Sequence, residues 1–400
     1  MAPHKIFNDP VYGFVTVPRG ILLDLVEHPW FQRLRRIRQL GMTDYVYPGA
    51  LHTRFQHALG SLHLMRSAVD VLRNKNISIS PEESEAVQIA ILLHDIGHGP
   101  FSHVLENTLL PYHHETLSRC IMAELNQQMD QRLTMALSIF EGSYPKPFLH
   151  HLVSGQLDMD RMDYLNRDSF FTGVHEGVIG YDRIVKMLSV VDDQLVVEEK
   201  GVYSIEKFLI ARRLMYWQVY LHKTVLAAEK MLIMLFQRLA RLYREGTVMP
   251  QSPILRNILD FSPSPNADPV DILPEFTRLD DHDIIQEIKI LRDSPDFLLR
   301  YVANCLLDRH LFKVRLDRQE MKPQDLDAIR QQLHDSFSNQ TPEWKQLLMT
   351  GIEESHAYQQ GAEEILILKK NGVVLPYSEE TDSPIQERIT RKYFAIYPRI

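Results

Sequence analysis

Apolar residues recur three and four positions apart over most of the chain between Ile21 and about Arg244. This spacing is clear in LLDLVEHPWFQRLRRIRQL and in LHLMRSAVDVLRN, and it is the period of an amphipathic helix. A later run, ARRLMYWQVYLHKTVLAAEKMLIMLFQRLARLY, predicts one long amphipathic helix. The pattern therefore predicts a bundle-like helical core.

One predicted helix is apolar on nearly every face. It begins at SPEE (80–83), a capping-box sequence with proline in the first helical position. The following AVQIAILL has no polar face, which is typical of a helix buried in the middle of its domain. The Gly-His-Gly-Pro run at 97–100 is expected to end it, so the helix leads directly into ILLHDIGHGPFSH (91–103), a stretch rich in ionisable groups.

The helical period breaks at two places. At DDQLVVEEKGVYSIEKF (192–208), alternation around Glu-Lys-Gly predicts a short β-hairpin. The composition also changes at MPQSP and at DFSPSPNADPVD, which predicts a linker or loop region at 248–270. We therefore expect a core of residues 1–247 before it and a C-terminal region, 271–400, that packs on this core. In that region EEILILKKNGVVLPYSEE and RKYFAIYPRI predict strands of a small sheet. The expected fold class is mainly α, with a short hairpin and a smaller α/β C-terminal part.

Composition narrows the class of protein. The net charge of -8 argues against strong nucleic-acid binding, although a local basic site for a small polyphosphate remains compatible with it. The only cysteines are Cys120 and Cys305, which excludes a disulfide framework and a cysteine-based zinc site. No run approaches the roughly 18 apolar residues that span a bilayer, and MAPHKIFNDPVYG lacks the apolar segment of a signal peptide. We therefore expect a cytoplasmic protein without a membrane segment.

Histidine is the residue type with an unusual count, 18 in total, and more than half of these lie between residues 52 and 151. His94 and Asp95 end the apolar helix, where an unpaired buried charge costs several kcal/mol. Partners, water or a metal ion must therefore neutralise the pair. The plainer interpretation is a histidine at the negative end of a helix dipole, with Asp95 accepting local hydrogen bonds.

Other motifs make this pair part of a larger set. HTRFQHALG (52–60) places Arg54 and His57 on one helix face, and LDMDRMDYLNRD places Asp160, Tyr164 and Asp168 on one helical stripe. Two imidazoles and two carboxylates suit Mn, Fe, Ni, Zn or, less readily, Mg, and such an ion activates water and screens a phosphoryl oxygen. The cations that could bind polyphosphate oxygens are Arg54, Arg161 and Arg212. Any one of them taken alone is more typical of a solvated helix surface.

These motifs and their flanks resemble one family. FQRLRRIRQLG, YPGALHTRFQHALG, LLHDIGHGPFSH, HHETLS and LDMDRMDYLNRD are similar to the HD-domain phosphohydrolases, and closely to their deoxynucleoside triphosphate triphosphohydrolase branch. The similarity runs from about Ile6 to Arg244. It implies an HD-domain helical core and a hydrolase that converts deoxynucleoside triphosphates (dNTPs) to deoxynucleoside and triphosphate. It also implies Mn, Fe, Ni or Zn at the site, with Mg on the substrate phosphates.

The resemblance also implies roles for single residues. The implied metal ligands are His57, His94, Asp95 and Asp160. The implied catalytic residues are His114, Glu115, His103 and His98, with His103 as the candidate acid toward the leaving oxygen. The implied substrate-binding residues are Arg54, Arg161 and Arg212 for the phosphates, Gln39, Leu40, Tyr164 and Asp168 for the sugar, and Tyr220 near the base. Where the family usually has a histidine near the base, this chain has Tyr216, so the base end of the site is not predicted.

Members of this family often form tetramers or hexamers that nucleotides activate. The resemblance therefore implies a homo-oligomer, from dimer to tetramer or hexamer, and a nucleotide activator. The candidate activator-binding residues are Asn8, Glu27, Gln32 and Arg35. The plainer alternative is an arginine-rich helix that contacts only solvent or its own subunit.

Two other functions remain open from the sequence. The same site could cleave another nucleotide or phosphate ester, or the protein could be a nucleotide-sensing oligomer with little turnover. The matched Gln39, Tyr164 and Asp168 argue against the first function. The complete ligand set together with His114 and Glu115 argues against the second.

Overall fold

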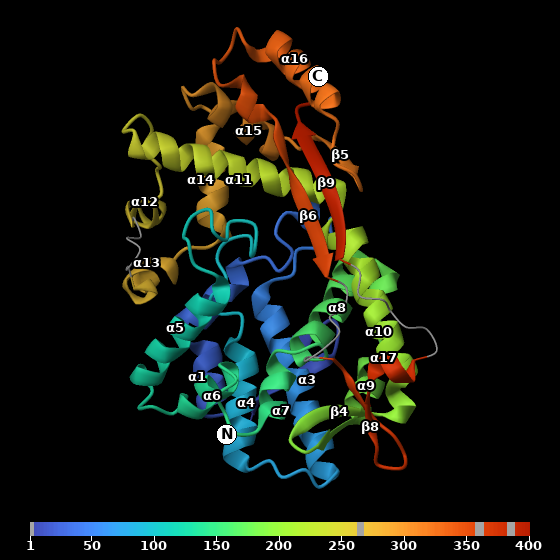
Figure 1. Ribbon diagram of the computed structural model, residues 1–400. Coiled ribbons are helices and arrows are strands. Elements are labelled where there is room, and N and C mark those ends of the chain that lie inside the picture. Colours follow the sequence, from blue (N-terminus) through green and yellow to red (C-terminus); the bar gives the residue numbers. More distant parts are fainter. Residues whose placement is uncertain (1–3, 262–267, 357–363, 382–388) are drawn as a thin grey trace.

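The computed structural model describes residues 4–261, 268–356, 364–381 and 389–400, and helices dominate it (Figure 1). The mainly α prediction is confirmed. The first helices are α1 (Ile21–Glu27), α2 (Pro29–Gln32), α3 (Arg54–Asn74), α4 (Pro81–Leu93), α5 (His114–Gln128), α6 (Thr134–Phe140), α7 (Pro147–Val153), α8 (Met159–Thr172), α9 (Tyr181–Met187) and α10 (Val202–Met215). The remaining helices are α11 (Lys223–Arg244), α12 (Pro253–Asp260), α13 (Leu273–Phe276), α14 (Asp281–Leu291), α15 (Phe297–Leu307), α16 (Pro323–Phe337) and α17 (Tyr377–Glu380).

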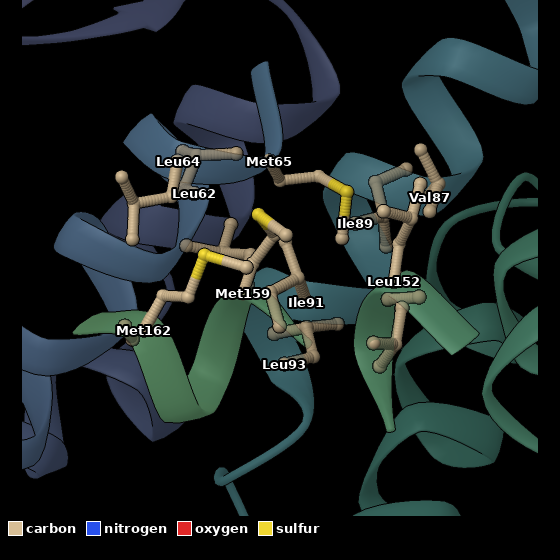
Figure 2. Close-up of a cluster of buried hydrophobic side chains, with 14 of the residues drawn as sticks. Leu62, Leu64, Met65, Val87, Ile89, Ile91, Leu93, Leu152, Met159 and Met162 are labelled. Carbon is tan, nitrogen blue, oxygen red and sulfur yellow. The ribbon is translucent and has the colours of Figure 1, made fainter. Parts of the chain in front are cut away.

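Helix α4 lies at the centre of a hydrophobic core that the N-terminal helices form. The predicted capping box is present, because Ser80 accepts a hydrogen bond from the Glu83 amide and the Glu83 side chain accepts one from the Ser80 amide. Figure 2 shows apolar side chains of α4 facing those of α3, α7 and α8. Burying each such side chain contributes about 1.5–3 kcal/mol. The helix ends at Leu93, four residues before Gly97, so His94 and Asp95 directly follow a rigid, buried helix.

The prediction of one long helix over 211–243 was wrong. Helix α10 ends at Met215, residues Tyr216–Tyr220 form a π-helical turn, and α11 begins at Lys223. The Nδ1 atom of His222 accepts a hydrogen bond from the Thr224 amide at 3.2 Å and caps the new helix. The apolar period continues through this break because both helices are amphipathic, so periodicity alone does not locate it.

The β-structure differs from the prediction in several places. The strands are β1 (His4–Asp9), β2 (Gly13–Pro18), β3 (Leu188–Val191), β4 (Gln194–Glu198), β5 (Lys313–Asp317), β6 (Met349–His356), β7 (Leu366–Leu368), β8 (Val374–Pro376) and β9 (Ile389–Tyr397). The predicted hairpin exists as β3–β4, but it turns at Asp192–Asp193, both in the left-handed region, and Glu-Lys-Gly forms a short 3₁₀ helix instead.

The expected single C-terminal sheet was also wrong. Strand β7 pairs in parallel with β4, which gives a sheet of order β3-β4-β7-β8, whereas β5, β9 and β6 form a separate antiparallel sheet. The predicted linker at 248–270 contains α12, and its residues 262–267 lie outside the described ranges. Helices α11, α14, α15 and α16 share a second core with β9 (Figure 1). Within the described ranges, every helix is too short or too polar to cross a bilayer.

Candidate functional site

The predicted metal ligands meet although separate segments carry them. His57 lies in the first turn of α3, His94 and Asp95 follow α4, and Asp160 lies in the first turn of α8. Nε2 of His57 is 3.0 Å from Oδ1 of Asp160 and 3.5 Å from Oδ2 of Asp95. Nε2 of His94 is 3.5 Å from Oδ1 of Asp160 and 3.4 Å from Oδ1 of Asp95. These spacings suit ligands placed around one ion at metal–ligand distances of about 2.1 Å.

The hydrogen bonds behind the two imidazoles favour metal binding. Nδ1 of His57 lies 2.7 Å from a carboxylate oxygen of Asp163, and Nδ1 of His94 lies 2.6 Å from the carbonyl oxygen of Ile91. Each Nδ1 is therefore the donor, which leaves the Nε2 lone pair free. Both Nε2 atoms are buried without a hydrogen-bond partner among the described residues. The donor set thus fits a divalent transition metal.

The carboxylates around His57 also favour a positive charge between them. Desolvation disfavours the charged imidazole, but the adjacent Asp160 and Asp163 carboxylates outweigh it and raise the pKa of His57 to about 10. Protonation of His57 and binding of a divalent cation at Nε2 would therefore compete.

A buried ionic network that the sequence analysis missed supports His57. Arg167 is fully buried, and its Nε and Nη2 donate to Asp163 at 2.8 and 2.9 Å. Its Nη1 donates to Asp9, at the end of β1, at 2.8 Å. The chain of contacts therefore runs from Asp9 through Arg167 and Asp163 to His57. The available signal was the i, i+4 spacing of Asp163 and Arg167 inside LDMDRMDYLNRD.

Three of the predicted catalytic residues form a histidine cluster. His98 and His114 stack with ring centroids 3.9 Å apart, and His103 meets them edge-on at 4.6 and 5.0 Å. The fourth predicted residue, Glu115, is exposed and lines the neighbouring cavity. Two other carboxylates contact the cluster. Oδ1 of Asp95 lies 3.3 Å from Nε2 of His98, and Glu106, which was not predicted although it follows His103 by three residues, contacts His103 and His114.

Glu106 orients two of these histidines. Its Oε1 lies 3.1 Å from Nδ1 of His114 and accepts a hydrogen bond from the His114 amide at 2.9 Å, and its Oε2 lies 3.0 Å from Nδ1 of His103. Burial disfavours the charged carboxylate, but the bonds from His103 and His114 outweigh it and hold the pKa of Glu106 well below its usual range. An ionised Glu106 accepts from both Nδ1 atoms, which leaves both Nε2 atoms for other partners.

The predicted sugar-binding residues meet further along α8. Oδ1 of Asp168 lies 2.8 Å from Nε2 of His52, and the Tyr220 hydroxyl donates to Oδ2 at 2.7 Å. The rings of Tyr164 and Tyr220 are 6.2 Å apart, edge to face. His52, which was not predicted, therefore holds one oxygen of the Asp168 carboxylate while Tyr220 holds the other.

The predicted phosphate-binding arginines differ in their surroundings. Arg54 is buried, donates to Asp95 and donates to the Ser102 hydroxyl at 2.7 Å, so it also supports a metal ligand. Arg161 donates to the carbonyl of Gly155 and forms an ion pair with Asp158 at 3.2 Å. Arg212 donates to Gln156 at 3.3 Å, and burial lowers its pKa, with the neighbouring Arg161 adding to the effect. Arg212 is thus a partly desolvated cation.

One cavity of about 590 Å³ joins most of these groups. Its wall includes Gln39, Leu40, Arg54, Asp95, His98, His103, His114, Glu115, Asp160, Arg161, Tyr164, Asp168, Arg212 and Tyr220. His57 and His94 are buried and do not line the wall. This volume lies in the range of small-molecule sites.

The candidate activator residues lie elsewhere, near the N-terminal hairpin. Glu27 forms an ion pair with Lys5 at 2.8 Å, and Gln32 donates to the Val26 carbonyl at 2.7 Å. Arg35 donates to Gln32 at 2.8 Å and lies 3.6 Å above the Phe55 ring. Asn8 faces Phe14 across the β1–β2 pair. These are contacts within one chain, and binding of an activator at these residues stays a prediction.

Gly97 allows the metal ligands and the histidine cluster to approach each other closely. Its amide donates to the Ser118 hydroxyl at 2.9 Å, and a Cβ added there would lie 2.3 Å from the His114 carbonyl oxygen. We expect Gly97→Ala to lower the free energy of unfolding by about 1–3 kcal/mol in urea titrations, because backbone atoms must move. The control is Gly99→Ala, whose Cβ would meet the Phe276 ring at 3.5 Å, an ordinary contact. Equal stability of the two variants would contradict the prediction.

Comparisons with known proteins show which family the chain is similar to. The HD domain model matches residues 54–167, and the HD associated region model matches residues 179–251. The crystal structure of a phosphohydrolase from Bacteroides thetaiotaomicron has a TM-score of 0.93 and 44% identity, over 99% of this chain and 100% of that chain. YwfO, an uncharacterized protein of Bacillus subtilis, is 33% identical over 322 residues, which are 78% of this chain and 72% of that protein.

A named enzyme is similar over a shorter region. The deoxynucleoside triphosphate triphosphohydrolase SAMHD1 homolog of Dictyostelium discoideum is 32% identical over 248 residues, which cover 57% of this chain and 48% of that protein. The HD domain match includes all the metal-ligand candidates, and the similarity to a solved phosphohydrolase extends over the whole length of both chains. The chain therefore belongs to the HD-domain phosphohydrolase family.

Proposed function

We propose that this protein hydrolyses dNTPs to deoxynucleoside and triphosphate. The observation that carries the proposal is one cavity whose wall contains metal-ligand carboxylates, desolvated arginines and an Asp168 carboxylate held by His52 and Tyr220. A metal ion on these carboxylates and the arginines would contact the triphosphate of a dNTP, and Asp168 would contact its sugar. The named activity of the Dictyostelium discoideum relative supports the same substrate class.

His57, His94, Asp95 and Asp160 would hold the metal ion. A divalent ion there supplies Lewis acidity at a phosphoryl oxygen and lowers the pKa of bound water. Asp163 and the Ile91 carbonyl keep both imidazoles in the tautomer that presents Nε2. Arg54 donates to Asp95 and to the Ser102 hydroxyl, and it therefore keeps the Asp95 carboxylate in position.

The arginines and the histidine cluster act on the triphosphate. Arg161 and Arg212 donate charge-assisted hydrogen bonds to its oxygens, which orients the α-phosphorus toward the metal ligands. Glu106 holds Nδ1 of His103, so Nε2 of His103 can donate a proton to the leaving 5′-oxygen. His114, held by the same carboxylate, and Glu115 act on the attacking side.

The sugar is recognised at α8. The Asp168 carboxylate accepts a hydrogen bond from the 3′-hydroxyl while His52 and Tyr220 keep it in position. The Tyr164 ring, which lies edge to face with the Tyr220 ring, would crowd a 2′-hydroxyl. Deoxyribose is therefore preferred through a satisfied hydrogen bond and through steric exclusion of ribose.

Product analysis tests the proposal. The protein, loaded in turn with Mn, Fe, Ni or Zn, is incubated with each of the four common dNTPs, and products are separated by ion-exchange chromatography. The expected products are deoxynucleoside and intact tripolyphosphate, with each ribonucleotide turned over at least about 10-fold more slowly. Pyrophosphate and monophosphate as products, or no dNTP turnover with any of the metals, would contradict the proposal.

A further inference from the structure

The far end of the same cavity is built by elements outside the HD domain match. Helix α11 contributes Glu229, Lys230 and Ile233, and strand β6 contributes Glu353. Nζ of Lys230 forms an ion pair with Glu353 at 2.8 Å. Figure 1 shows β6 extending from the C-terminal part toward α8 and α10. The C-terminal sheet therefore closes one end of the candidate active site.

Tyr216 also lines this cavity. Its hydroxyl donates to the Glu354 carbonyl at 2.8 Å, and both Glu353 and Arg212 are close enough to act on it electrostatically. Among the described residues, the charged groups that act on Glu229 are Lys230 and Glu353. A ligand bound with its phosphates at Arg212 and its sugar at α8 would have its remaining part in the cavity that Glu229 also lines.

The Glu229 carboxyl has no hydrogen-bond or ion-pair partner in the part of the chain that the structure describes. It faces the cavity beside Gln39 and Leu40, because a Cβ added to Gly41 would lie 3.3 Å from its Oε1. Burial raises the pKa of Glu229 to about 8, with Glu353 adding to the effect and Lys230 opposing it. Near neutral pH the group is therefore mostly a neutral carboxylic acid with an unused donor and an unused acceptor.

We propose that the Glu229 carboxyl binds the hydrogen-bonding edge of the substrate's nucleobase. This inference rests on the proposed function, and it names the group that selects the base. A neutral carboxyl presents an O–H donor beside a C=O acceptor, which forms two hydrogen bonds with a base edge that has an adjacent acceptor and donor. A ligand without such an edge leaves the carboxyl unsatisfied and binds more weakly.

Two substitutions and one inorganic probe test this role. Glu229→Gln keeps an adjacent donor and acceptor in the same shape, whereas Glu229→Met keeps the length and removes both. The control is Glu245→Gln, which changes an exposed glutamate at the other end of α11. The measurements are kcat/KM for the four common dNTPs and the inhibition constant of inorganic tripolyphosphate, which occupies only the phosphate end. Thermal melting of each variant reports folding.

We expect Glu229→Met to lower kcat/KM for the best dNTP at least about 10-fold, mainly through KM, and to leave tripolyphosphate inhibition unchanged. Glu229→Gln is expected to stay within about 3-fold of the wild type for that dNTP, and Glu245→Gln to match the wild type. Unchanged kcat/KM in Glu229→Met, or an equal loss of dNTP and tripolyphosphate affinity, would overturn the base-binding role while the proposed function stands. A wild-type protein without dNTP turnover would instead overturn the proposed function.

Discussion

Replacing Asp160 with alanine is expected to lower dNTP hydrolysis at least about 10³-fold and to release the bound metal. Asp160 Oδ1 lies within 3.5 Å of Nε2 of both His57 and His94, so its loss removes the ligand that both imidazoles share. The measurements are the steady-state rate of tripolyphosphate release and the metal content after dialysis, by mass spectrometry.

The fold is expected to survive this substitution. The Asp160 side chain is 27% exposed and lies in the first turn of α8, where the cap is Asp158 and not Asp160. A matched control is Asp182→Ala, which removes an exposed aspartate from the first turn of α9. This control should keep wild-type metal content and activity. Retention of metal or of full activity in Asp160→Ala would exclude the assigned site.

Replacing Arg167 with methionine is expected to lower the free energy of unfolding by about 3–5 kcal/mol. The substitution leaves Asp163 and Asp9 buried without their cation, and the cost of an uncompensated buried charge dominates. Because Asp163 also accepts from Nδ1 of His57, metal affinity should fall about 10–100-fold. Urea unfolding gives the first quantity, and a metal titration against a competing chelator gives the second.

Two variants separate the network from a general effect of losing an arginine. Arg167→Lys keeps the charge but loses the planar fork that binds Asp163 through two bonds, so an intermediate loss of stability is expected. Arg183→Met removes an arginine whose only side-chain bond in the described residues is an exposed one to the Lys200 carbonyl, and it should stay within about 0.5 kcal/mol of the wild type. Similar losses in Arg167→Met and Arg183→Met would contradict a special role for the network.

Local sequence patterns predicted several features correctly. The capping box at 80–83 and the apolar helix after it depend on residues within four positions of each other, and both are present. Asp160, Tyr164 and Asp168 share a helical stripe because they are four residues apart, and all three lie on α8. Patterns of this kind are visible in the sequence because the helical backbone alone determines which of these residues share a face.

Other features depend on contacts between distant segments. Glu106 lies in an irregular loop, so no period relates it to His114, and only the fold brings the two together. His52 meets Asp168 across 116 residues of chain, and Asp9 meets Arg167 across 158. The break at 216–222 escaped prediction because the apolar period continues through it. The parallel pairing of β4 with β7 likewise joins segments that have no local relation.

The sequence by itself determined the helical class and the buried helix α4, since composition and short-range spacing are local properties, and the family resemblance of its motifs predicted the metal ligands. Only the tertiary structure decided that Glu106 contacts His103 and His114, that Asp163 and Arg167 support His57, and that Glu229 lines the cavity. The physical reason is that burial and hydrogen-bond partners, which give these groups their protonation state and their role, arise only when distant segments pack together.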